Sequence, residues 1–317
     1  MFFVLIGLVI LALFSGAEKV SLSSFFDASL KPFQKIILFD IRLPRILLCL
    51  LCGVLLGGCG AVFQGFFRNP LADSGILGIS SGATLGAIAG GMIPFFADIS
   101  FKFLSPVSVF AFAGGLGAGF LVFVLSFAFR KSSSVTLLLT GTALGTFISS
   151  ISSFLMLAGK KELRTIFAWT MGSFNSKGWD DFYFILIPSL LAVALLLVCA
   201  RSLDVLGSGE TTAVSLGLNI GLVKFFVLIS GSLATACAVC GGGIISFVGL
   251  ISPHIVRKLF GTSHKIVIPL SMVCGSVLLL FADTLSRILI APSEIPVGII
   301  TALIGVPFFI MVLRKDS

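Results

Sequence analysis

Long apolar stretches separated by short polar turns recur along the whole chain of 317 residues. A helix needs about 20 apolar residues to span a bilayer, and ten stretches approach or reach this length. They cover residues 1–16, 43–63, 74–96, 103–129, 135–158, 182–200, 221–240, 242–260, 264–283 and 295–313. The pattern predicts an all-α integral membrane protein with about ten transmembrane helices. The stretch at 242–260 is the weakest, because its apolar run stops at Pro253 and His254.

The first stretch, residues 1–16, has two interpretations because it is both short and apolar. A cleavable signal peptide would carry basic residues ahead of the apolar core and a small-residue cleavage site, and neither is evident here. We therefore expect a retained helix. The longest polar gaps, 17–41 and 159–181, are only loop-sized, so residues 1–317 are predicted to form a single transmembrane domain.

Composition supports the membrane assignment. The chain is 57% hydrophobic and 11% charged with a mean hydropathy of +1.19, whereas soluble domains are about 25% charged. The formal net charge of +8 indicates loops anchored at anionic lipid rather than a nucleic-acid partner. Basic residues of the short loops favour the side that holds both termini, which predicts cytoplasmic termini. These residues are Arg130, Lys131, Arg257, Lys258, Lys265, Arg314 and Lys315.

No enzymatic or metal site is evident. Seven cysteines lie inside apolar runs without histidine at ligand spacing, so we expect them to pack as small apolar residues. His254 and His264 are expected to be helix-end residues rather than metal ligands. The chain lacks a glycine-rich phosphate loop, which places any ATP hydrolysis on another subunit. The deepest apolar stretches hold no ionisable side chain, which argues against an ion-coupled carrier.

Small and hydroxylated residues are frequent inside the predicted helices. Gly82 with Gly86, and Gly141 with Gly145, place two small residues four apart, a spacing that lets membrane helices approach closely. Hydroxyl side chains either line a weakly polar passage or bond to their own helix backbone, and both interpretations stay open. They are Ser80, Ser81, Thr140, Thr142, Thr146, Ser149 and Ser150.

A series of short motifs occurs in a characteristic order. They are Arg42-Leu43-Pro44-Arg45, Asn69-Pro70-Leu71-Ala72, Gly78-Ile79-Ser80-Ser81-Gly82-Ala83, Trp169-Thr170-Met171-Gly172-Ser173, Leu216-Gly217, Phe247-Val248-Gly249-Leu250-Ile251-Ser252-Pro253-His254, Ala282-Asp283 with Arg287, and Glu294-Ile295-Pro296-Val297-Gly298. From about residue 40 to the C-terminus the chain closely resembles the permease subunit of ABC importers for iron chelates, haem and cobalamin.

The resemblance implies a type II ABC importer permease fold in a bacterial cytoplasmic (inner) membrane. It also implies a homodimer whose interface forms the translocation path, although a heterodimer with a paralogue stays open. The implied partners are two ATPase subunits, which carry ATP and Mg, and a periplasmic or lipid-anchored substrate-binding protein. Iron chelates are the leading substrate class, while haem, cobalamin and molybdate remain alternatives.

Three groups of site residues follow from the resemblance. Arg42, Arg45 and Arg287 fall at the predicted outer ends of two spans, where the family grips carboxylates of the binding protein; the alternative is interfacial arginines whose charged heads reach toward water. A cytoplasmic loop at about 204–219 is expected to fold into two short helices that couple to the ATPase. Its proposed coupling residues are Leu206, Gly207, Glu210, Ala213, Leu216 and Gly217.

The third expectation is a cytoplasmic gate at Ser133, Ser134 and Val135; the alternative is an ordinary turn, since a serine-rich segment is typical of any short loop. The sequence thus predicts a permease subunit for ATP-driven import of a metal chelate. A secondary transporter or channel that no ATPase drives, or a membrane receptor, are the alternatives. Dependence of uptake on an ATPase subunit separates the first from the other two.

Overall fold

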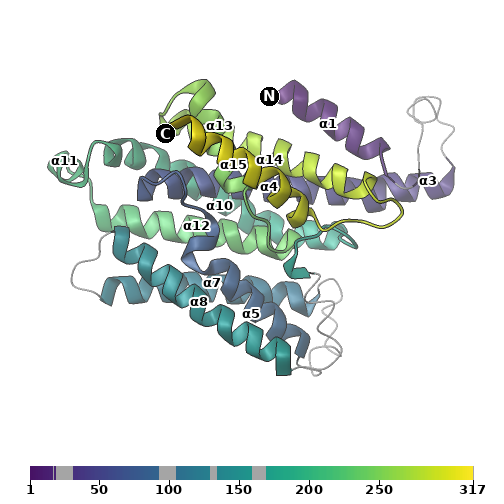
Figure 1. Cartoon of the computed structure of the whole chain (residues 1–317), viewed down its shortest axis with the longest axis horizontal. Helices are drawn as coiled ribbons and strands as arrows, with labels where there is room; N and C mark the ends of the chain where they lie inside the picture. The colour runs from purple at the N-terminus through teal and green to yellow at the C-terminus, as the bar shows by residue number, and fades with distance from the viewer. Residues whose placement is uncertain (17, 19–30, 93–104, 129–133, 159–168, 317) are drawn as a thin grey trace.

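The computed structural model describes residues 1–16, 18, 31–92, 105–128, 134–158 and 169–316, and all regular structure in these ranges is helical. Figure 1 shows the helices in one bundle. The longer ones are α1 (Phe2–Phe14), α4 (Leu43–Phe67), α5 (Ile79–Met92), α7 (Pro106–Ala128), α8 (Ser134–Ala158), α10 (Trp179–Gly207), α12 (Ile220–Gly242), α13 (Val248–Phe260), α14 (His264–Ile288) and α15 (Val297–Asp316). Short helices are α3 (Pro32–Ile36), the π-helix η1 (Ile37–Arg42), the 3₁₀-helix η2 (Ser74–Leu77) and α11 (Glu210–Ser215).

Helix α4 lies at the centre of the bundle and packs against α10, α12, α13 and α14. Most of its residues are buried. Helices α5, α7 and α8 form a second group on one side (Figure 1), joined to the first through the contact of α7 with α12. The central position of α4 agrees with its sequence, which is apolar or small on every face.

Local sequence signals explain where two helices begin and where α4 ends. Asn219 caps α12, because its side chain accepts a hydrogen bond from the backbone N–H of Leu222 at 3.1 Å. Asp181 lies in the first turn of α10 and accepts from the backbone N–H of Gly178 at 3.2 Å. Arg68 ends α4 in the left-handed conformation, at φ 48°.

Helix boundaries differ from the sequence prediction at two places. The helical run that contains α4 begins at Pro32 rather than at 43, since α3 and η1 lead into it without a break. Proline is favoured at the first position of a helix, and this signal marks the true start. The predicted span at 242–260 contains a helix only from Val248. The chain bends before it, where Gly243 adopts a φ of 73°.

Six helical stretches of the described chain are long and apolar enough to cross a membrane: Pro32–Phe67, Pro106–Ser126, Val135–Ala158, Trp179–Gly207, Ile220–Gly242 and His264–Ile288. The all-helical, multi-pass membrane architecture is therefore confirmed. Helices α5 and α13 have only 14 and 13 residues. The count of about ten spans stays a prediction.

Candidate functional site

The predicted coupling loop, at about residues 204–219, forms a compact helical corner between α10 and α12, which we call the coupling corner. Helix α10 runs on to Gly207, and α11 follows after a turn in which Gly209 has a φ of 116°. The resemblance predicted two short helices here, but the structure has only α11, because residues 204–206 include no proline or glycine and α10 continues through them to Gly207. A second turn at Gly217, with a φ of 83°, leads into α12.

Two side chains fasten this corner to the bundle and two others face away from it. Leu206 and Ala213 are buried within the main hydrophobic core. Val214 is exposed, and Leu216 is 68% exposed. Figure 1 shows α11 projecting at one end of the molecule. The predicted coupling segment therefore presents apolar side chains on a firmly attached helix.

The opposite end holds a buried cluster of charged residues. Arg45 donates to Asp283 Oδ1 through Nη2 at 2.8 Å and through Nε at 3.1 Å. Its Nη1 donates to both carboxylate oxygens of Glu294 at 2.9 Å. Arg287 completes the cluster, since its Nε lies 3.2 Å from Asp283 Oδ2. Two arginines thus share one fully buried carboxylate.

Arg287 of this cluster and Arg42, which lies outside it, also hold helix α1. Arg287 donates to the carbonyl oxygen of Ala12 at 3.0 Å, and Arg42 donates to that of Leu13 at 2.9 Å and to that of Glu18. The last carbonyl groups of a helix have no partner within it and carry partial negative charge. The two guanidinium groups therefore cap the C-terminal end of α1.

The structure brings the three predicted docking arginines together but buries them. Arg42, Arg45 and Arg287 are each 6% exposed and bind acceptors of their own chain. In the sequence, Asp283 and Glu294 stand only as motif residues, and their pairing with these arginines was not predicted. Asp283 lies four residues before Arg287, a helical spacing that indicates such a pair. A docking role of the arginines stays a prediction.

The gate prediction falls largely outside the described side chains. Ser133 lies outside the described residues, and Ser134 begins α8 with a side chain that is not described. Val135, in the first turn of α8, is exposed. The gate at these three residues stays a prediction.

Helix α8 presents an exposed face that combines hydroxyl and apolar side chains. Thr142, Thr146 and Ser150 are exposed and donate to the carbonyl oxygens four residues earlier at 2.8 to 2.9 Å. Ser149 contacts Ser81 of α5 at 3.0 Å between their hydroxyl oxygens. The hydroxyl groups are thus satisfied within the chain, and this face is only weakly polar.

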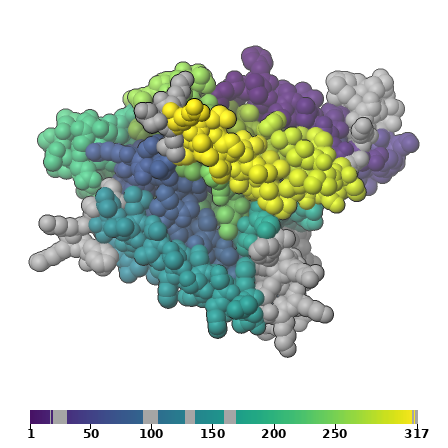
Figure 2. Space-filling model, in the orientation of Figure 1, coloured from purple at the N-terminus to yellow at the C-terminus, as the bar shows by residue number. Residues whose placement is uncertain are grey.

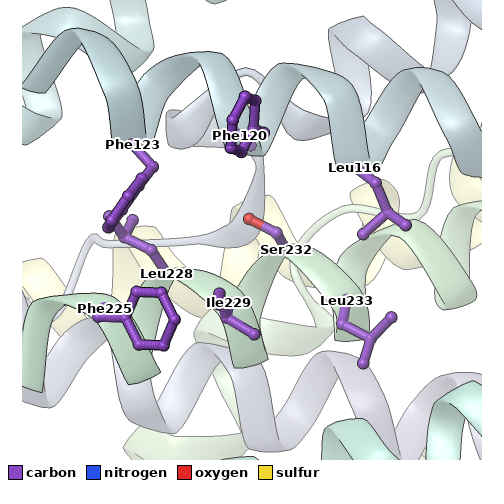
Figure 3. Close-up of a pocket in the computed structure, with 9 residues that line it drawn as sticks. Leu116, Phe120, Phe123, Phe225, Leu228, Ile229, Ser232 and Leu233 are labelled. Atoms are coloured by element: carbon purple, nitrogen blue, oxygen red, sulfur yellow. The ribbon is translucent and has the colours of Figure 1, made fainter. Parts of the chain in front are cut away.

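A separate apolar groove lies between α7 and α12 (Figure 3). Its volume is about 280 Å³, and Ser232 is its one hydroxyl-bearing lining residue. Phe120 and Phe123 from α7 face Phe225 and Ile229 from α12 across it. Both helices are of membrane-spanning length, so this groove lies between two candidate membrane spans.

Asp73 is partly buried in the turn between α4 and η2. Its Oδ1 accepts from the backbone N–H of Ser74 at 2.7 Å. Burial raises the pKa of this carboxyl group, and the hydrogen bonds from Ser74 offset only part of the shift. A raised folded-state pKa means that ionised Asp73 weakens the folded state as the pH rises through that pKa.

We therefore expect Asp73→Asn to stabilise the protein at neutral pH, since the amide oxygen still accepts the hydrogen bond from Ser74 but carries no negative charge away from water. The melting temperature in detergent should rise by a few degrees at pH 7.5 and match the wild type at acidic pH, where Asp73 is protonated. A variant that is less stable at both pH values would contradict this interpretation.

A bundle of membrane-length helices with a weakly polar exposed face and a projecting end helix indicates a multi-pass membrane protein. The chain matches the FecCD transport family over residues 4–315 and belongs to it.

Individual relatives agree with this family. The chain is 41% identical to the cobalamin import system permease protein BtuC of Halobacterium salinarum, over 88% of this chain and 74% of that protein. It is 36% identical to the hemin transport system permease protein HmuU of Yersinia pestis, over 99% and 95% of the two chains. A solved metal-chelate type ABC transporter in an inward-facing conformation is similar with a TM-score of 0.87 and 33% identity, covering 99% of this chain and 97% of that one.

Proposed function

We propose that this chain is the transmembrane permease subunit of an ATP-driven ABC importer of a metal chelate. Family membership and the similarity to the metal-chelate type transporter support this class. The observation that carries the coupling step is α11, a short helix rooted in the core by Ala213 that presents Leu216 outward. A partner ATPase subunit binds ATP and Mg and uses this helix as its contact.

The transport path lies between two copies of the chain. Helices α8 and α15 lie on the same face of the bundle (Figures 1 and 2), and both expose apolar side chains such as Leu139, Phe147, Leu303 and Ile310. A second permease copy covers these side chains and brings the hydroxyl groups of α8 to the dimer axis. Small hydroxylated and aliphatic side chains bind a chelate weakly, so tight recognition belongs to the binding protein.

Substrate arrives with that binding protein on the face opposite α11. Docking there uses the charged cluster around Arg45, where Glu294 has a side chain that is 27% exposed. A carboxylate of the binding protein reaches Arg45 by taking the place of Glu294. Two of the relatives are named as permeases for cobalamin and for hemin. For this chain we propose ferric siderophore, haem or cobalamin as the substrate.

Uptake assays separate this function from a channel or a secondary carrier. Membranes of the native bacterial cell should accumulate radiolabelled ferric siderophore, haem or cobalamin only while the co-purifying ATPase subunit is active. A catalytically inactive ATPase subunit should abolish uptake. Uptake that continues without ATP hydrolysis would overturn the proposal.

Leu216→Asp should detach the ATPase while leaving the bundle folded. Loss of an apolar side chain at the centre of an interface costs about 1–2 kcal/mol of binding where that side chain is a main anchor, and a charge there adds a desolvation cost. We expect the amount of co-purified ATPase subunit to fall about tenfold. Ile36→Asp, an exposed apolar site at the opposite end, is the matched control and should keep wild-type recovery. Equal recovery from both variants would argue against α11 as the contact.

A further inference from the structure

The last turns of α10 carry the coupling corner and contact the start of α14. Asp204 Oδ1 accepts from the backbone N–H of His264 at 2.7 Å and lies 2.8 Å from its Nδ1. Asp204 Oδ2 accepts from the Ser263 hydroxyl at 3.1 Å. A carboxylate from one helix therefore caps the N-terminus of another, where free N–H groups and the helix dipole favour negative charge.

Helix α4 joins the same corner. Arg68, at its C-terminal end, donates to the carbonyl oxygen of Leu206. Gly65 packs directly on the imidazole of His264, since an added methyl group would lie 2.2 Å from His264 Nε2. The end of α10 is thus fastened to both α4 and α14 immediately before the coupling helix begins.

Helices α4 and α14 are antiparallel and in backbone contact. A methyl group on Gly57 would lie 2.1 Å from the carbonyl oxygen of Ser271, and one on Gly275 would lie 2.3 Å from that of Gly53. Ser276 also donates to the carbonyl oxygen of Leu50 at 2.9 Å. Such close contact leaves little freedom for one helix to slide along the other.

The same helix pair reaches the charged cluster at the far end. Arg45 of α4 binds Asp283 of α14 there. Each helix has 25 residues, which corresponds to a length of roughly 37 Å. The pair therefore connects the coupling corner to the face on which we place the binding protein.

We propose that Asp204 is a positioning residue for coupling. Its hydrogen bonds attach the coupling corner to the α4–α14 pair, so that a movement of α11 displaces both helices together. This displacement changes the position of the charged cluster at the opposite end of the pair. This inference rests on the proposed function, because it assigns a route between the ATPase contact and the binding-protein contact of an importer.

The test uses the complete transporter, purified from the native membrane through a tag on this chain. ATP hydrolysis is measured with and without the substrate-loaded binding protein. Asp204→Ala should reduce the stimulation by the binding protein about fivefold or more, with unchanged basal hydrolysis and unchanged ATPase recovery. Asp204→Asn keeps an oxygen that can accept from the His264 backbone, so it should restore part of the stimulation. Lys265→Ala, an exposed neighbour in the first turn of α14, should behave as the wild type.

A second variant covers the case in which Asp204→Ala does not fold. His264→Ala removes the ring contact but keeps the backbone N–H that Asp204 accepts from, and it should lower the stimulation by a smaller factor at unchanged basal hydrolysis. Wild-type stimulation in Asp204→Ala, or in His264→Ala when Asp204→Ala cannot be purified, overturns the inference. An equal loss of basal and stimulated hydrolysis also overturns it. Absence of any ATPase subunit from the wild-type preparation instead contradicts the proposed function itself.

Discussion

Asp283→Ala is expected to be the most destabilising change at the charged end of the bundle. The substitution removes the carboxylate that Arg45 and Arg287 share, and both guanidinium groups would then stay buried with less compensation. Loss of one partner from a buried ion pair costs about 3–5 kcal/mol. The purified variant should show a strongly lowered melting temperature in detergent, or fail to accumulate as monodisperse protein.

Glu294→Ala is the matched control for this change. Glu294 binds the same arginine, but its side chain is 27% exposed and that of Asp283 is 0% exposed. Water can replace part of the lost interaction at Glu294, so the variant should melt much closer to the wild type. Equal melting temperatures of Asp283→Ala and the wild type would show that the cluster contributes little to stability.

Gly57→Ala is expected to force α4 and α14 apart. The added methyl group would lie 2.1 Å from the carbonyl oxygen of Ser271, a backbone atom that cannot rotate away. Overpacking of a buried site costs about 1–3 kcal/mol, occasionally more, and here the strain arises in the contact between α4 and α14. The melting temperature of the purified variant in detergent should be lower than that of the wild type.

Gly117→Ala supplies the comparison, because a methyl group at Gly117 of α7 meets nothing within 4 Å. Alanine has the higher helix propensity by about 1 kcal/mol, so this variant should be as stable as the wild type or slightly more stable. If Gly57→Ala and Gly117→Ala were equally stable, the close approach of α4 and α14 would not be needed for folding.

Sequence patterns located the membrane helices better than their ends. The predicted stretches at 43–63, 135–158 and 264–283 fall within α4, α8 and α14, since apolar length alone identifies a helix that must satisfy its backbone hydrogen bonds inside lipid. The helical run from Pro32 and the late start of α13 at Val248 were missed. Both boundaries depend on local backbone geometry at Pro32 and Gly243 rather than on hydropathy.

At the candidate site, the location of the arginines was predictable from the sequence, but their partners were not. Their shared location followed from their positions at the ends of predicted spans, and the ordered motifs indicated the FecCD transport family that the comparisons confirm. Their partners did not follow, because Arg45 and Asp283 are separated by 238 residues. Only packing of α4 against α14 brings these charges within hydrogen-bond distance.

The sequence by itself determined that this is a membrane protein, that it is all-helical and to which family it belongs, because each of these depends on composition, apolar length or short motifs. Only the tertiary structure decided which charges are buried together, that a single short helix projects at the coupling corner, and that Asp204 caps α14. These features depend on contacts between residues far apart in the chain, and no local pattern encodes the distance between them.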